Sequence, residues 1–424
     1  MIAKAQRWIS YPAILAGLFI LWPVVAYMGG QGFTALVGLA ALPVLYFAQP
    51  KSVPPYALAF IAFILWAMLS TLWSPEGDGL FSGSLSEGSF AISADALRIG
   101  LSALAMGAVT FAMRHVSVDA PRSCFVLRTV PAVQAAGVIV TVLAMEPILH
   151  VLAPYSDPET EMPQNLMRNA NALTLLLPLL LAWLWQGGEK VLRSIAALLV
   201  VTLAWAVYTT GSEAAVMALI GMSAAMLVVW RFQKTGLSAL FAFTAGYILL
   251  APLIMTQIKG VMRIIGIDFP LSSWSRAHAW QAVGDRIQEA PLAGHGLEAS
   301  KRWDETFATK PAALEEIVKD TNPDWVWQAY QIIPGHPHNM PLQIWAETGL
   351  IGAVLAAGTC LLVSLRLYQV SHIPPIARYA GAGLFGACLI FFSFSYSMWN
   401  DAFWSSVALA TAAVLLFGRQ TAQS

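Results

Sequence analysis

The stretch HPHNMPLQIWAETGLIG, residues 336–352, joins a polar, histidine-rich segment directly to a long apolar one. Because proline suits the first turn of a helix, the stretch predicts a helix that begins near Pro341. His338 and Asn339 would then lie just outside that turn, where a membrane helix meets water. Gly349 and Gly352 lie about one turn apart, a spacing that lets a second helix approach closely. An ionisable, hydrogen-bonding pair is therefore expected at the mouth of a packed helix, although a juxtamembrane loop in which His and Asn adjoin by chance also fits these residues.

Composition indicates the fold class. Hydrophobic residues make up 58% of the 424 residues and charged residues only 11%, which argues against a soluble domain. Apolar blocks of membrane-spanning length recur from end to end, so we predict an all-α polytopic membrane protein. The net charge is zero, and no basic stripe with interleaved aromatic residues points to a nucleic-acid partner. The three cysteines lie far apart in or beside apolar blocks, which favours packing over disulfides or metal ligation.

Twelve apolar segments are predicted to span the membrane. Their approximate limits are Tyr11–Met28, Gly32–Ala48, Pro55–Leu72, Ala94–Met113, Phe125–Leu149, Ala170–Trp185, Ser194–Tyr208, Ala214–Trp230, Leu237–Ile258, Leu342–Leu365, Ile376–Phe394 and Phe403–Phe417. Lys4 and Arg7 precede the first segment, and no small-residue cleavage site follows it. We therefore expect a first span there and not a removable signal.

Basic residues indicate the orientation of these spans. With a cytoplasmic N-terminus, the inner loops and the C-terminal end hold Lys51, Arg114, Arg122, Arg128, Lys190, Arg193, Arg231, Lys234, Arg366, Arg378 and Arg419. The short outer segments hold only Arg98 and Arg168 as basic residues. This asymmetry follows the positive-inside rule and predicts that both termini are cytoplasmic. The predicted regions are spans one to nine over residues 1–258, an outer loop over 259–340, and spans ten to twelve over 341–424.

The outer loop has a helical pattern of its own, as functional loops of this length often do. An amphipathic helix is predicted over residues 275–290. Its apolar stripe consists of Trp280, Val283 and Ile287, and its opposite polar face consists of His278, Asp285 and Glu289. Arg276 lies at the head of the stripe. Its guanidinium either reaches water while its stem covers apolar surface, or binds an anion such as phosphate.

Other outer residues carry separate expectations. Arg168, Asn169 and Asn171 are expected to open the sixth span, and residues 210–213 and 400–401 are expected to form tight turns before the eighth and twelfth spans. Asp95 and Arg98, three residues apart on a helix, are predicted to pair with each other. A brief helix is predicted over residues 312–319. The aromatic residues after it are expected to anchor the membrane interface, with glycan stacking as the alternative: Trp325, Trp327 and Tyr330.

Two segments of the chain resemble a known family. His338-Asn339, nine residues and then Gly349-Leu-Ile-Gly352 is similar to the signature of the O-antigen ligase and polymerase superfamily. The upstream segment from SRAHAW to PLAGHG, residues 275–296, is similar to the family's second block. The resemblance covers about residues 165–352, and the first five spans resemble the family only in hydropathy. Glu213 stands where many relatives have a basic residue, so no role is carried onto it.

The resemblance implies a membrane glycosyltransferase of the C-type (GT-C-like) on the periplasmic face of a Gram-negative inner membrane. Its donor would be O-antigen on undecaprenyl diphosphate, and its acceptor a sugar hydroxyl of the lipid A–core oligosaccharide. The family acts without a nucleotide sugar, an organic cofactor or a required metal. The implied partners are the two lipid-linked glycans and the lipid bilayer, and no nucleic acid is implied.

The chemistry of such a transfer assigns roles to particular residues. A diphosphate is already a good leaving group, so it needs charge stabilisation more than protonation. Arg276 and Arg168 are the predicted diphosphate ligands because arginine keeps its charge and suits phosphate oxygens. The acceptor hydroxyl needs a base or an aligning group, and His338 is the predicted catalytic residue. Asn339 would orient His338 or bind the acceptor, and His336 would bind substrate or serve the local structure.

Several alternatives stay open. Direct attack would invert the anomeric centre, whereas double displacement needs a carboxylate nucleophile, for which Glu347 lies one turn too deep. A zinc site would use His336 and His338, but no third ligand stands at metal spacing. The same superfamily also includes O-antigen polymerases and protein O-oligosaccharyltransferases. A lipid or glycolipid transporter is the alternative of a different class, and it would show inverted halves with helices broken at mid-membrane.

Overall fold

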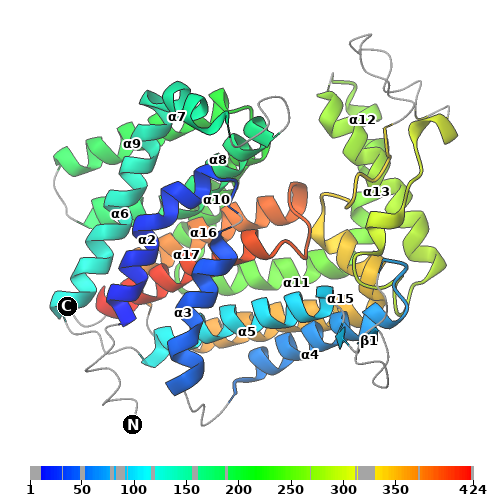
Figure 1. Cartoon of the computed structure of the whole chain (residues 1–424), viewed down its shortest axis with the longest axis horizontal. Coiled ribbons are helices and arrows are strands. Elements are labelled where there is room, and N and C mark those ends of the chain that lie inside the picture. The colour runs from blue at the N-terminus through cyan, green and yellow to red at the C-terminus, as the bar shows by residue number, and fades with distance from the viewer. Residues whose placement is uncertain are drawn as a thin grey trace.

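The computed structural model of the chain describes residues 11–30, 32–47, 53–76, 81–82, 91–92, 94–115, 120–154, 161–186, 190–267, 269–310, 313, 330–370 and 373–421. Trp325, Trp327 and most of the helix predicted over 312–319 lie outside these residues, as do Lys4 and Arg7. The described part is almost entirely helical, and its N-terminal and C-terminal helices pack against one another (Figure 1).

Each predicted span coincides with a helix. In chain order the helices are α2 (Tyr11–Tyr27), α3 (Phe33–Phe47), α4 (Pro55–Leu69), α5 (Ala94–His115), α6 (Ala120–Leu143), α8 (Glu161–Gln186), α9 (Lys190–Thr209), α10 (Glu213–Phe232), α11 (Gly236–Met255), α15 (Met340–Gln369), α16 (Pro375–Phe394) and α17 (Asp401–Thr421). Among the described residues, seven helical segments are long and apolar enough to cross a membrane, and one of them contains both α10 and α11. Shorter apolar helices lie within α2, α3, α6 and α9. The chain is therefore an all-helical polytopic membrane protein.

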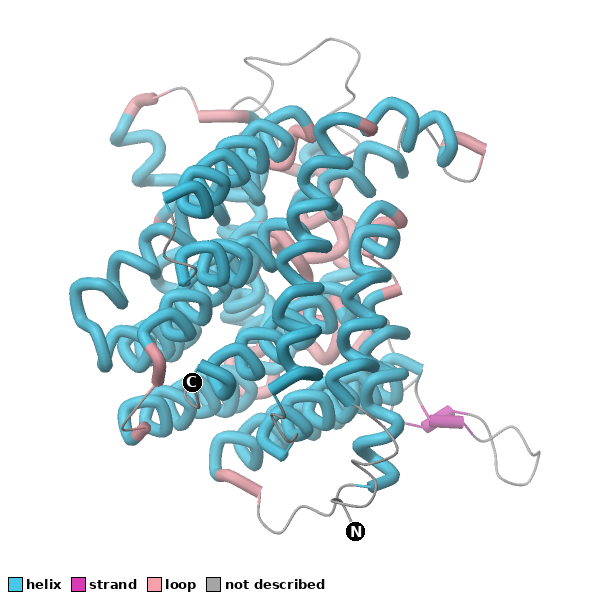
Figure 2. Tube along the Cα trace, turned by 90° about the vertical axis from the view of Figure 1, so that its left-hand side faces the viewer, coloured by secondary structure: helices cyan, strands magenta, loops and turns pink. Residues whose placement is uncertain are grey.

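Short elements connect the long helices. The 3-10 helix η1 (Ser70–Leu72) extends α4, α7 (Met145–Leu152) follows α6, and η3 (Gln233–Thr235) joins α10 to α11. A two-stranded antiparallel hairpin that the sequence did not predict pairs β1 (Phe81–Ser82) with β2 (Ala91–Ile92) and projects from the bundle (Figure 2). The start of α2 and the end of α17 lie at one end of the molecule, away from α12 and α13 (Figure 1).

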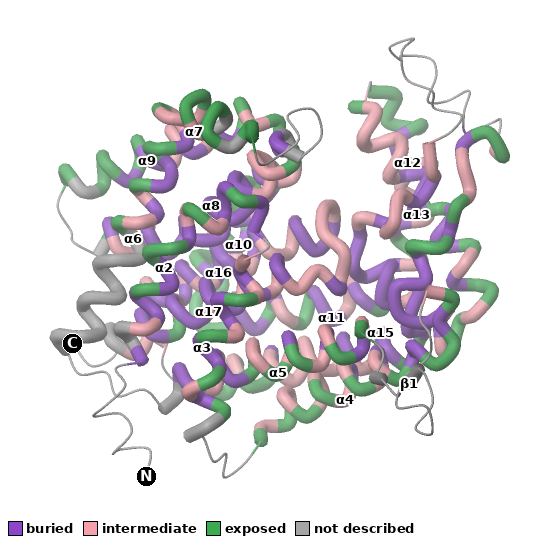
Figure 3. The backbone as a smooth tube through the Cα atoms, in the orientation of Figure 1, coloured by how far each residue is buried: buried purple, intermediate pink, exposed green. Residues whose placement is uncertain are grey.

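Large apolar side chains face outward along the long helices. Leu65 of α4, Leu198 of α9 and Leu253 of α11 are 57%, 64% and 70% exposed, and the outer surfaces of the helices carry many such positions (Figure 3). Water would penalise this exposure, whereas hydrocarbon tails accept it, and the helices satisfy their own backbone groups. The inner faces bury aromatic residues such as Trp22 and Phe391.

The segment between α11 and α15 contains α12 (Ile258–Ile265), α13 (Leu271–Glu289), η4 (Ala299–Arg302) and η5 (Phe307–Thr309). Helix α13 starts four residues before the predicted helix. Its predicted apolar stripe is confirmed: Trp280, Val283 and Ile287 are 0–5% exposed. The prediction of a polar face is wrong for His278, which is buried edge-on against the ring of Phe307. The loop folds over α13, so the helix is covered on more than one side.

Helix α8 also starts earlier than predicted, at Glu161. Arg168, Asn169 and Asn171 therefore lie inside a helix and not at its opening. The predicted turn before α10 is confirmed, because α9 ends at Thr209 and α10 begins at Glu213. The turn before α17 lies earlier than predicted: the Asn400 amide donates to the Ser397 carbonyl (3.1 Å), and Asp401 already belongs to α17.

Helix α15 is broken at Gly349, whose backbone (φ 66°, ψ −167°) is not helical. Segment 291–296 lies against the break. Four backbone hydrogen bonds of 2.9–3.3 Å join them, from the amides of His295 and Gly296 to the carbonyls of Ala346 and Glu347, and from the amides of Leu350 and Ile351 to the carbonyls of Pro291 and Leu292.

Gly294 of segment 291–296 and Gly349 of α15 both lie at this break. A Cβ on Gly349 would collide with the backbone of Leu292, and one on Gly294 would collide with the backbone of Glu347. The prediction that Gly349 admits a second helix is therefore wrong, since Gly349 admits loop backbone. Gly352 does face a helix, because the nearest residue outside α15 is Trp66 of α4.

Candidate active site

The start of α15 anchors the candidate site, and the predicted helix start near Pro341 is confirmed. The helix begins at Met340, and the Asn339 side chain caps it by accepting a hydrogen bond from the Leu342 amide (3.0 Å). The same side chain donates to the Tyr247 hydroxyl of α11 (2.9 Å) and to the Ser393 carbonyl of α16 (3.0 Å). Asn339 is fully buried. Its amide thus ties three helices together directly beside His338.

His338 is held with one ring nitrogen bonded and the other available. Its Nδ1 lies 2.7 Å from the carbonyl oxygen of Ser395, at the end of α16. A carbonyl only accepts, so a neutral His338 carries its proton on Nδ1 and leaves the Nε2 lone pair unprotonated. The backbone of His338 adopts a left-handed conformation (φ 51°), which is uncommon for residues other than glycine. The partly exposed ring is therefore fixed in the tautomer that a general base needs.

His336 and α13 hold this loop from the other side. The His338 amide donates to Nδ1 of His336 (3.1 Å), and the two rings lie 4.2 Å apart between centroids. The Trp280 indole of α13 donates to the Pro337 carbonyl (2.9 Å). Burial, helped by the neighbouring His338, lowers the pKa of His336 to about 3. His336 is therefore neutral at physiological pH, and its Nδ1 is occupied as an acceptor.

Arg276 of α13 brings a positive charge to the site. Burial lowers the pKa of His338, the Ser395 hydrogen bond opposes this, and the charge of Arg276 adds to the lowering. Burial also lowers the pKa of Arg276, while the Glu213 carboxylate counteracts it. The Arg276 guanidinium lies 3.7 Å from the carboxylate of Glu213, at the start of α10. The charge of Arg276 therefore acts on His338, and the Glu213 carboxylate lies beside Arg276.

Arg168 of α8 donates from its guanidinium to the Gln164 side chain (3.4 Å), and it affects Tyr396 through its charge. The side-chain amide of Asn171 in α8 donates to the Tyr396 hydroxyl (2.9 Å), and the side-chain oxygen of Asn171 accepts from the Ser212 hydroxyl (2.9 Å). Burial raises the pKa of Tyr396, and the Asn171 hydrogen bond and the charge of Arg168 oppose that rise. The structure thus links α8, the turn before α10 and the residue after Ser395. Sequence reasoning missed Tyr396, and only the SYS sequence at the end of an apolar span hinted at it.

Glu347 lies about two turns along α15 from Met340 and is fully buried. Its carboxylate accepts from the Ser300 hydroxyl (2.7 Å), the Gln343 amide (3.1 Å), the Glu298 backbone amide (2.9 Å) and the Trp399 indole. Four donors saturate this carboxylate, so Glu347 joins the outer loop to α15 and to the loop after α16. This arrangement supports a structural role and not that of a nucleophile.

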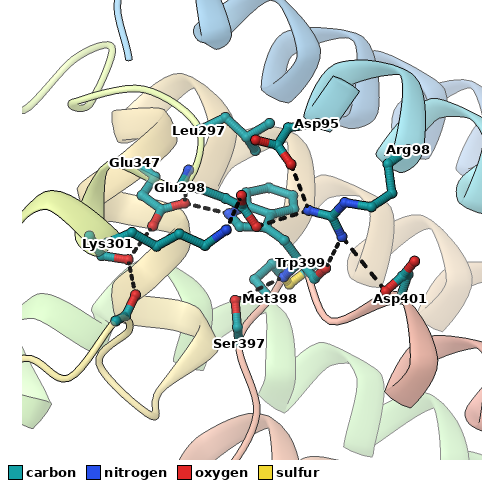
Figure 4. Close-up of polar contacts among 12 residues, drawn as sticks. Asp95, Arg98, Leu297, Glu298, Lys301, Glu347, Ser397, Met398, Trp399 and Asp401 are labelled. Atoms are coloured by element: carbon teal, nitrogen blue, oxygen red, sulfur yellow. Dashed lines mark hydrogen bonds and ion pairs between the residues drawn. The ribbon is translucent and has the colours of Figure 1, made fainter. Parts of the chain in front are cut away.

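A second ionic cluster surrounds Arg98 beside Glu347 (Figure 4). The predicted pair of Asp95 and Arg98 is confirmed at 3.3 Å. Arg98 also binds the Glu298 carboxylate at 2.9 Å and the Trp399 carbonyl at 3.0 Å, and it lies 3.6 Å from Asp401. Arg98 thus connects α5, the outer loop and the loop between α16 and α17, which contains the Ser395 carbonyl.

A metal site at His336 and His338 would need at least one further ligand. In the part of the chain that the structure describes, no cluster of three or more His, Cys, Asp or Glu side chains is placed to hold a metal ion. His336 and His338 meet each other, but no third ligand of this kind joins them there.

Comparison with known proteins relates part of the chain to a family. Residues 198–357 match the sequence model of the family described as O-antigen ligase. The chain carries an O-antigen ligase family domain. A protein of Rickettsia conorii named "Putative polysaccharide ligase" is 30% identical over 158 residues, which make up 36% of this chain and 34% of that protein. A protein of Rickettsia bellii with the same descriptive name is 33% identical over 154 residues, 35% and 33% of the two chains.

The matched region spans about a third of the length of these relatives. No solved structure matches the chain. The O-antigen ligase family domain runs from α9 into α15 and includes Glu213, Arg276, His336, His338 and Asn339. Arg168 of α8, and Ser395 and Tyr396 of the loop after α16, lie outside it.

Proposed function

We propose that the protein is an O-antigen ligase, which transfers a glycan from undecaprenyl diphosphate to a sugar hydroxyl of lipid A–core oligosaccharide. The observation that carries the proposal is the free Nε2 of His338, set by the Nδ1 bond to Ser395, beside the positive charge of Arg276. A base next to a fixed cation suits a reaction in which a hydroxyl loses a proton while a diphosphate gains charge. The family match supports the glycan-transferring class.

The proposed step balances as a single displacement. The acceptor oxygen forms a bond to the anomeric carbon, and the bond from that carbon to the diphosphate oxygen breaks with its electron pair on the diphosphate. The hydroxyl proton passes to Nε2 of His338, and Arg276 and Arg168 stabilise the charge on the diphosphate. The saturated carboxylate of Glu347 offers no nucleophile, so the step inverts the anomeric centre.

The supporting residues receive positioning roles. Asn339 caps α15 and holds His338 at its mouth, and His336 braces the His338 backbone. No residue in this scheme requires a metal ion, and we propose a metal-independent enzyme. The proposed setting is a Gram-negative inner membrane with twelve GT-C-like spans, both termini cytoplasmic and the loop over residues 259–340 periplasmic. The start of α2 and the end of α17 lie opposite α12 and α13, which supports this topology (Figure 1).

The break in α15 is the observation that bears on a transporter, because broken helices line substrate paths in many transporters. Here the outer loop satisfies the broken backbone through four hydrogen bonds, with glycine contacts too close to admit a side chain. A packed break of this kind supports a rigid site and not alternating access.

Transfer in a purified system tests the proposal. Lipid-linked O-antigen and rough lipopolysaccharide are mixed with the protein in detergent with EDTA, and wild type is compared with His338→Ala. His150→Ala, which changes an exposed histidine of α7, is the matched control. High-molecular-weight lipopolysaccharide from wild type and the control, but not from His338→Ala, is the expected result. Longer lipid-linked chains from the donor alone would identify a polymerase, and full activity of His338→Ala would exclude the histidine mechanism.

A further inference from the structure

We propose that Glu213 is a built-in competitor for the donor diphosphate: its carboxylate occupies the anion-binding side of Arg276, and it sets donor affinity and product release. This inference rests on the proposed function, because it takes the diphosphate as the ligand of Arg276. It concerns a residue that the sequence analysis left without a role.

The geometry shows one carboxylate oxygen held by two groups of α13. Oε2 of Glu213 accepts a hydrogen bond from the Ser272 hydroxyl at 2.9 Å and lies 3.7 Å from Nη1 of Arg276. Ser272 and Arg276 are one helical turn apart, so both side chains reach the same point from one face. A hydroxyl and a guanidinium that converge on one anionic oxygen also form the donor set that a phosphate oxygen needs.

The exposure of the partners makes the carboxylate displaceable. The Glu213 side chain is 55% exposed, whereas that of Arg276 is 26% exposed. Arg276 is held on α13, with its Nη1 also 3.4 Å from the Ser272 carbonyl. Glu213 is the first residue of α10, and the helix start is capped by the Ser212 side chain and not by Glu213. Glu213 can therefore swing into water without unfolding the helix start, while Arg276 stays in place.

The energies favour exchange by a diphosphate. A partly exposed carboxylate–guanidinium pair is a weak interaction, because water competes for both partners. A diphosphate carries more charge and more acceptor oxygens than one carboxylate, so it can displace Glu213 from Arg276. After transfer, the return of Glu213 to Arg276 would help release the undecaprenyl diphosphate product. The residue would thus weaken binding of substrate and product together.

The test measures binding without requiring transfer. Full-length protein in detergent is titrated with undecaprenyl diphosphate, and with undecaprenyl monophosphate and inorganic diphosphate for comparison. Glu213→Gln is expected to bind undecaprenyl diphosphate about two- to fivefold more tightly than wild type. Glu213→Asp, which keeps the charge but shortens the reach to Arg276, is expected to shift affinity in the same direction by less.

Two controls make the result specific. Glu289→Gln removes an exposed charge elsewhere on α13, at a pair with Arg286, and is expected to leave affinity unchanged. In an Arg276→Gln background, Glu213→Gln is expected to have no effect, because the competition needs both partners. Unchanged or weaker binding by Glu213→Gln, with a normal melting temperature, would overturn the inference.

The outcome also separates the inference from the proposed function. Tighter binding by Glu213→Gln in a protein that transfers no glycan would support competition by Glu213 and contradict the ligase function. Glycan transfer together with an unchanged affinity of Glu213→Gln for undecaprenyl diphosphate would support the ligase function and contradict competition by Glu213. In an active enzyme, Glu213→Gln is further expected to show a lower donor KM and stronger inhibition by added undecaprenyl diphosphate.

Discussion

The burial of His338 and the charge near it decide its pH behaviour. Burial and Arg276 lower its pKa below the ordinary histidine value, so the neutral base persists as pH falls below 6.5. We expect the acid limb of kcat/KM to lie below pH 6.5. Arg276→Gln removes the charge that lowers this pKa and should move the limb to higher pH. Initial transfer rates across roughly pH 4.5 to 8 measure both; a limb of wild type above 6.5 would contradict the assignment.

His336 should make stability depend on pH. Its pKa is about 3 when folded and 6.5 when free, so the unfolded chain binds more protons between these values and stability falls as pH falls through this window. At pH 5 the loss is about 2 kcal/mol, which follows from the two pKa values. We expect the melting temperature of His336→Gln to fall less steeply than that of wild type between pH 7 and 5. Parallel curves would show that His336 is not buried as a neutral group.

At the scale of elements, the break in α15 depends on glycine for its contact with segment 291–296. Gly294→Ala should destabilise the protein by about 2–4 kcal/mol, because a methyl group at φ 72° also collides with the Glu347 backbone. Gly335→Ala is the matched control, since Gly335 has a similar φ of 73° but an added Cβ would meet no atom within 4 Å. The control should lose only about 1–2 kcal/mol. Thermal unfolding in detergent measures both, and equal losses would show that the contact does not matter.

At the scale of the whole molecule, Arg98 joins the outer loop to the helix bundle. Arg98→Ala leaves the buried Glu298 carboxylate with Lys301 as its remaining ionic partner, which should destabilise the fold by about 2–4 kcal/mol. Glycan transfer should fall as well, because the Ser395 carbonyl lies in the loop that Arg98 holds at Trp399. Arg231→Ala, at an exposed arginine of α10, should change neither the stability nor glycan transfer. A folded, fully active Arg98→Ala would contradict this linkage.

Sequence alone determined the membrane class, the positions of the long helices and the helix start at Met340, because hydropathy and helix-start preferences are local properties. It also indicated His338, Arg276 and the Asp95–Arg98 pair, although the catalytic roles remain predictions. Only the tertiary structure decided that Ser395 selects the tautomer of His338, that Glu213 faces Arg276 and that Gly349 meets loop backbone. The residue pairs are His338 and Ser395, Glu213 and Arg276, and Gly349 and Leu292, which lie 57, 63 and 57 positions apart in the sequence. No local pattern encodes such contacts, because they arise only when distant helices and loops pack together.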